Sequence, residues 1–147
     1  MNFSGTVTIK APRQTVWEFI TDVHKVSSCA PGIESVEVIT PNQKFRATAS
    51  VGFGSVKAKF NGTGEFIELD APNRAKIKGH GDAPGSAVDV ISEMRLSDGP
   101  GATTELNWTA DVIIVGMLAS LAARMMGGMV KLLTGEFFNC VQKKIEA

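Results

Sequence analysis

The alternation of apolar and polar residues between positions 33 and 115 is the feature that most limits how this chain can fold. A period of two is typical of strands that bury one face. Residues that favour turns interrupt the alternation at 41–42, 52–54, 70–73, 82–85 and 98–101. Because connections this short join neighbouring antiparallel strands, we predict a meander of six strands. They are expected near residues 33–39, 43–51, 55–69, 74–82, 86–96 and 103–115.

The residues on either side of the meander predict one more strand and three helices. Residues 2–10 alternate in the same way and are expected to form the first strand. An apolar stripe behind Pro12 predicts a helix that ends near Asp22, because proline suits the first turn of a helix. A short second helix is expected over 23–29, and a long one over 116–145.

Together these elements predict a fold of the α+β class. A curved seven-stranded antiparallel sheet would wrap around the long C-terminal helix, with two short helices between the first two strands. A chain of 147 residues suits one domain with a single sizeable core, so we assign 1–147 to one domain. The alternation changes phase at Phe66 and Ile67, which predicts a bulge near residues 64–66.

Small residues dominate the face of the middle strands that should point inward. Of 13 such positions, eight are Ala or Gly. The positions are Phe45, Ala47, Ala49, Val51, Val56, Ala58, Phe60, Gly62, Gly64, Ala75, Ile77, Gly79 and Gly81. A face of this kind leaves space between sheet and helix, so we predict an apolar ligand cavity there. Close approach of the helix, or glycines used for sheet curvature, would explain the same pattern.

The long helix also favours a cavity, because its apolar arc is wider than one sheet face needs. Four of the six methionines fall in it, and the flexible methionine side chain suits a surface that adapts to an apolar guest. The residues expected to line the cavity are Phe45, Ala47, Ala58, Phe60, Met94, Leu106, Trp108, Met117, Leu121, Met125 and Met129.

The charges are balanced in number but not in predicted position. Fifteen basic and 15 acidic residues cancel, which argues against a protein that coats nucleic acid. Seven basic residues share the outward positions of the middle strands, with no acid at the positions considered, whereas the next two strands are mainly acidic outward. The seven are Lys44, Arg46, Lys57, Lys59, Arg74, Lys76 and Lys78. This face would dock an acidic partner or an anionic membrane, or it is simply solvated.

Few residues suit catalysis or metal binding. Cys29 and Cys140 lie far apart without a metal-binding motif, so we expect two reduced core residues and no metal or cofactor. His24 and His80 are expected in solvated or capping positions, and Asp111 is a lone carboxylate, so no catalytic residue is assigned. No secretory signal precedes the first strand, which favours the cytoplasm.

Four stretches resemble the family of carbon monoxide dehydrogenase G subunits. They read D-V-H-K-V-S-S-C-A-P-G at 22–32, G-T-G-E at 62–65, G-H-G-D-A-P-G-S-A-V-D-V at 79–90 and T-E-L-N-W-T-A-D-V-I-I-V-G-M-L-A-S-L-A-A-R at 104–124. The resemblance implies the START-like (SRPBCC) helix-grip fold and an accessory protein of molybdenum hydroxylase systems. It also implies help with membrane association or electron transfer, at the inner face of the cell membrane, and it brings no catalytic residues.

Three functions follow as hypotheses. The first is a non-enzymatic protein that binds a lipophilic molecule, such as a quinone, between sheet and helix. The second is an adaptor whose basic sheet face docks one of the molybdenum hydroxylase subunits. The third is an enzyme similar to the polyketide cyclases of the same superfamily, which would use Asp111, His24 or His80.

Overall fold

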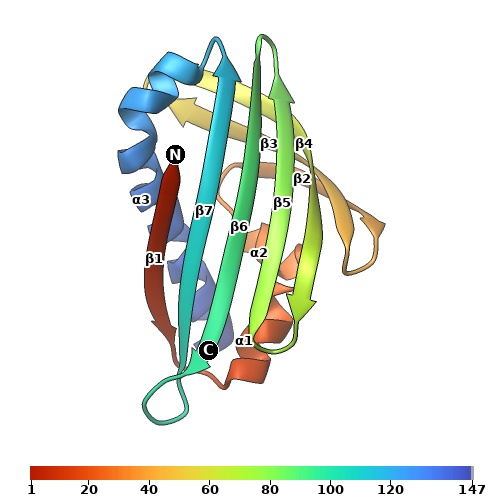
Figure 1. Cartoon of the computed structure of the whole chain (residues 1–147), viewed down its shortest axis with the longest axis vertical. Coiled ribbons are helices and arrows are strands. Elements are labelled where there is room, and N and C mark those ends of the chain that lie inside the picture. The colour runs from red at the N-terminus through yellow and green to blue at the C-terminus, as the bar shows by residue number, and fades with distance from the viewer. Residues whose placement is uncertain (147) are drawn as a thin grey trace.

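The computed structural model describes residues 1–146, which form a seven-stranded antiparallel sheet and three helices (Figure 1). The strands lie in the order β1-β7-β6-β5-β4-β3-β2, and α3 runs behind β1 and β7 in the view of Figure 1. The elements in chain order are β1 (Asn2–Ile9), α1 (Arg13–Ile20), α2 (Val23–Cys29), β2 (Ile33–Thr40), β3 (Lys44–Phe53), β4 (Val56–Asp70), β5 (Arg74–Ala83), β6 (Ser86–Asp98), β7 (Thr104–Gly116) and α3 (Ala119–Glu146).

The predicted fold class and the order of all ten elements are confirmed, and two details differ. The long helix begins at Ala119 rather than 116, because Gly116 has a φ of 94° and the Met117 N–H donates to the Gly85 carbonyl oxygen. The bulge in β4 lies one position beyond the predicted range. Phe66 still pairs with Ile77, and the register with β5 shifts between Phe66 and Glu68.

The space between sheet and helices holds two separate apolar clusters. The lower cluster joins α1 to the C-terminal half of α3 and includes Ile9, Trp17 and Leu106. The upper cluster joins the β3–β4 hairpin to the first turns of α3 and has Phe53 and Phe60 at its centre. The sheet is therefore fixed to α3 at both ends.

Much of the small-residue face is closely packed, so part of the expected cavity is filled. The ring of Phe45 lies over Gly64, and Phe60 together with Val88 lies over Gly81. A Cβ atom built on Gly62 would lie 2.5 Å from the carbonyl oxygen of His80. These glycines make room for aromatic rings and for the neighbouring strand, which is the close-packing explanation of the pattern.

The expectation of two reduced cysteines is wrong. Cys29 and Cys140 form a disulfide with a Cα–Cα distance of 5.4 Å, and no cysteine is free in the described chain. The side chain of Asp22 caps α2 by accepting the N–H groups of His24 and Lys25, and Cys29 then ends this helix against α3. Sequence spacing missed the pair because 111 positions separate its members.

Candidate ligand-binding site

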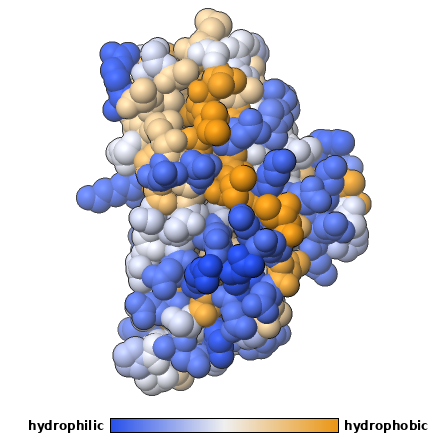
Figure 2. Space-filling model, in the orientation of Figure 1, coloured by the Kyte–Doolittle hydropathy of each residue, from blue (hydrophilic) through white to orange (hydrophobic). Residues whose placement is uncertain are grey.

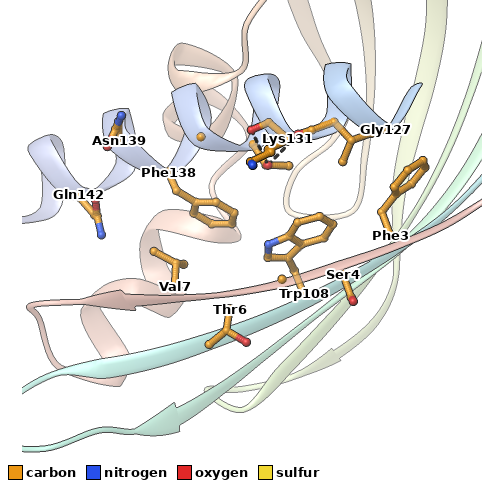
Figure 3. Close-up of a pocket in the computed structure, with 14 residues that line it drawn as sticks. Phe3, Ser4, Thr6, Val7, Trp108, Gly127, Lys131, Phe138, Asn139 and Gln142 are labelled. Carbon is orange, nitrogen blue, oxygen red and sulfur yellow. Dashed lines mark hydrogen bonds between the residues drawn. The ribbon is translucent and has the colours of Figure 1, made fainter. Parts of the chain in front are cut away.

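A pocket of about 490 Å³ lies between the edge strand β1 and the middle of α3 (Figure 3). Its apolar wall has side chains from both elements and from β7, and polar side chains of α3 form its rim. The lining residues are Phe3, Ser4, Gly5, Thr6, Val7, Trp108, Gly127, Val130, Lys131, Thr134, Gly135, Phe138, Asn139 and Gln142. A volume of this size is in the range of small-molecule sites.

The periodicities of the two elements place these side chains together. Phe3 and Val7 lie on the inward face of β1, where every second residue points to the helix. On α3, Gly127, Lys131 and Phe138 follow each other at intervals that keep them on one helical face. One strand face and one helix face thus form the two walls.

Trp108 forms the floor of the pocket and depends on the glycine opposite it. Trp108 on β7 pairs with Gly5 on β1, and its indole ring lies across that glycine. A Cβ atom on Gly5 would come within 2.7 Å of the indole Nε1 atom and 2.9 Å of Cε2. Figure 3 shows the indole facing Phe138 of α3 across the pocket. Gly5 therefore lets a large aromatic ring reach the open edge of the sheet.

Of the eleven residues predicted to line a cavity, one, Trp108, is among the residues that line this pocket. The structure places Ala58, Phe60, Leu121, Met125 and Met129 in the upper cluster, and Met94 and Leu106 in the lower one. Phe45 covers Gly64, and Ala47 pairs with Gly62. Met117 lies in the turn before α3, where it is 78% exposed, so its assignment to the cavity is wrong. The prediction missed Phe3, Val7, Val130 and Phe138.

The seven basic residues lie on the outer face of the sheet, where acids outside the positions considered in the sequence accompany them. Glu65 pairs in register with Lys44 on one side and Lys78 on the other. Arg74 contacts Glu68 at 2.6 Å and Glu93 at 3.4 Å. Further exposed pairs join Arg46 to Glu37 and Lys59 to Glu34, while Lys76 faces Glu68 and Glu93 in register. These carboxylates compensate the positive charge locally, and docking through this face stays a prediction.

An apolar patch interrupts the outer face over the strands β6 and β7 (Figure 2). Its members are Ile91, Ile113 and Val115, whose exposed fractions are 43%, 57% and 53%. Ile113 lies opposite Asp89 and Ile91 opposite Asp111, so acidic side chains border the patch. Contiguous apolar surface of this kind marks interaction sites more often than chance.

His80 lies on the outer face between two carboxylates. Its Nδ1 atom is 2.7 Å from Asp89, and its Nε2 atom is 3.1 Å from Asp82. The hydrogen bonds to Asp89 and then Asp82 raise the pKa of His80 above its ordinary value. His24 is exposed in α2, and Asp111 is exposed near the middle of β7, where it pairs with Ile91, whereas His80 lies beyond β6 in register with Asp89, so the three residues considered for catalysis are not brought together.

The raised pKa of His80 predicts a stability that depends on pH. Because the folded state favours the imidazolium, its contribution is fully present below the unfolded pKa and is lost as pH rises through the raised folded pKa. We expect the free energy of unfolding to fall more for the natural protein than for His80→Gln between about pH 6 and about pH 9. Urea titrations at each pH measure this difference, and parallel profiles for the two proteins would contradict it.

Among residues 1–146, none of the helices combines the length and the apolar character that a membrane span requires. Within the same residues, no three side chains of His, Cys, Asp or Glu come close enough to hold a metal ion.

Comparisons with known proteins agree with this architecture. The model of the CoxG family, the G subunits of carbon monoxide dehydrogenase, matches residues 5–146. No curated protein matches the sequence. A solved structure of a conserved protein from Geobacillus kaustophilus is 28% identical with a TM-score of 0.90, covering 99% of this chain and 95% of the other.

Two further solved structures show the same fold at lower identity. The Zhui aromatase/cyclase from Streptomyces sp. R1128 is 20% identical with a TM-score of 0.76, and the match covers 99% of this chain and 93% of the cyclase. A START superfamily protein from Mycobacterium smegmatis is 11% identical with a TM-score of 0.70, covering 99% and 97%. These likenesses confirm the helix-grip fold of the START-like superfamily.

Proposed function

Because this chain belongs to the CoxG family of carbon monoxide dehydrogenase subunits, we propose that it is a non-enzymatic accessory protein that carries a lipophilic molecule, such as a quinone. Its client would be a molybdenum hydroxylase of the carbon monoxide dehydrogenase type. The observation that supports this proposal is the pocket between β1 and α3, where aromatic and aliphatic side chains form both walls. A planar or prenylated guest would bury apolar surface between Trp108 and Phe138, with about 25 cal/mol per Å² as the driving force.

The chemistry of the pocket favours carriage over catalysis. Lys131 is the one lining side chain with an acidic or basic group, while the others are apolar groups, hydroxyls and amides. General acid–base catalysis works with groups that titrate near the operating pH and that orient each other. A cyclase-like activity would therefore need residues outside this pocket, and fold similarity to a cyclase does not supply them.

The outer face supports a peripheral contact with the membrane or with the client enzyme. The patch of Ile91, Ile113 and Val115 gives an apolar surface, and basic residues of β5 such as Lys76 and Lys78 lie beside it. A lipophilic cargo has to be collected from a bilayer, and an apolar surface beside basic side chains suits transient binding to an anionic membrane. Electrons would then pass to or from the membrane with the cargo.

Mass spectrometry of an organic extract tests whether the protein carries a lipophile. Protein purified from its own host should release a prenylated or aromatic compound. In a second arm, decylubiquinone is added to the Trp17→Phe variant, in which Trp108 is the remaining tryptophan. We expect saturable quenching of Trp108 fluorescence, because this indole forms the floor of the pocket. An extract without any lipophile, together with no saturable quenching, would overturn the proposal.

A further inference from the structure

We propose that the ligand of this pocket carries an oxygen atom that accepts a hydrogen bond from the indole N–H of Trp108, with its head group beside Lys131. This inference rests on the proposed function and narrows the ligand to one chemical class. The class is an amphiphile whose polar end is a neutral or anionic oxygen acceptor, and not an ammonium group.

The indole N–H of Trp108 is a donor without a partner. Among residues 1–146, its Nε1 atom takes part in no hydrogen bond with another protein group, although the ring is half-buried. No fully enclosed side-chain nitrogen or oxygen of these residues lacks a partner, so this N–H is not sealed in the core, and the indole ring that carries it lines the pocket. A tryptophan N–H in a sheltered position usually finds an acceptor. Here a ligand oxygen is the group that would supply it.

Three polar side chains that line the pocket are engaged in holding the fold. The Gln142 amide donates to the Thr8 carbonyl oxygen at 3.0 Å and ties α3 to β1. The Thr134 hydroxyl donates to the Val130 carbonyl oxygen at 2.7 Å within α3. The Thr6 hydroxyl bonds to Asn107 on the outer face. These three side chains position the walls, whereas the indole N–H of Trp108 holds no neighbouring element in place.

The charges around the pocket determine which charge the head group of the ligand can carry. No carboxylate is among the lining residues, and Lys131 is the charged one. In the described chain, Lys131 has no carboxylate within 4.0 Å, so its ammonium group is free to meet an anion. An ammonium head group would meet a positive charge and find no acceptor carboxylate, whereas a carboxylate would find both the indole N–H and the ammonium group, and a neutral carbonyl oxygen would find the indole N–H.

Three probes whose carbon chains have the same length test the inference by isothermal titration calorimetry: decanoate, methyl decanoate and decylamine. The acid and the ester both carry an acceptor oxygen, and only the acid carries a negative charge. We expect decanoate to bind most tightly, methyl decanoate several-fold more weakly, and decylamine at least about tenfold more weakly than decanoate.

Two substitutions separate the two donors. Trp108→Phe keeps an aromatic floor without the N–H, and we expect it to weaken binding of decanoate and of the ester by about three- to tenfold each. Lys131→Met should weaken decanoate by a similar factor and leave the ester unchanged. Lys143→Met removes the same charge from α3 outside the pocket and should change neither affinity.

The outcomes distinguish this inference from the proposed function. The inference would be overturned if all three probes bound with equal affinity and if Trp108→Phe bound them as tightly as the natural protein does. The proposal of a lipophile carrier would then still stand. Binding of decylamine alone would overturn it as well. No binding of any probe, together with an extract free of lipophiles, would overturn both.

Discussion

Replacing Cys29 and Cys140 together with serine should lower the free energy of unfolding by about 2 to 5 kcal/mol. The disulfide closes a loop between residues 111 positions apart, which lowers the conformational entropy of the unfolded chain. Without the disulfide this entropy rises, so the unfolded state is favoured more strongly. It also removes the covalent link between the end of α2 and the helix that carries one wall of the pocket. Urea denaturation of the oxidised protein and of the double variant measures the difference.

Two controls show whether the covalent bond itself is responsible. A reducing agent should bring the natural protein down to the stability of the double variant and leave the variant unchanged. Lys144→Met removes the hydrogen bond from Lys144 to Ser28 in the same α2–α3 contact and should cost no more than about 0.5 kcal/mol, because this contact is exposed. If the double variant and the reduced natural protein both unfold at the urea concentration of the oxidised protein, the disulfide does not stabilise the fold.

The sequence predicted the fold well because local patterns determine most of it. Alternation and turn residues placed all seven strands, and short connections allowed one pairing order for six of them. The first short helix followed from Pro12, and Asp22, which was predicted as the end of that helix, also proves to cap the second one. The start of α3 and the position of the bulge in β4 were harder to predict from the sequence. Gly116 delays the start of α3, and Phe66 keeps its inward position before the bulge.

The site was predicted less well, because it depends on distances between elements that are far apart in the sequence. The alternation showed that Ala and Gly dominate the inward face of the middle strands. It did not show that aromatic rings lie over Gly64 and Gly81, because that depends on packing between strands. The pocket forms instead where α3 passes the edge strand, and the inward positions Phe3 and Val7 on β1 were the available signal. The disulfide and the carboxylates beside the basic residues are likewise products of long-range pairing.

Gly127→Leu should abolish most ligand binding while making the protein more stable, which is the second large effect that we expect. Gly127 lines the pocket, and a Cβ atom there would meet open space. An isobutyl side chain would occupy volume that the ligand needs, so affinity for decylubiquinone should fall about tenfold to a hundredfold. Leucine also favours a helix more than glycine does, which should add about 0.5 to 1 kcal/mol to the free energy of unfolding.

Gly128→Leu is the matched control, because the neighbouring glycine lies outside the pocket on the same exposed stretch of α3 and also has open space around its Cβ position. Both variants should gain similar stability in urea denaturation, and only Gly127→Leu should lose affinity in the fluorescence titration. A general disturbance of α3 would weaken binding in both variants, and a ligand site elsewhere in the molecule would leave binding intact in both. The difference between two adjacent glycines therefore tests whether the ligand occupies the space between α3 and β1.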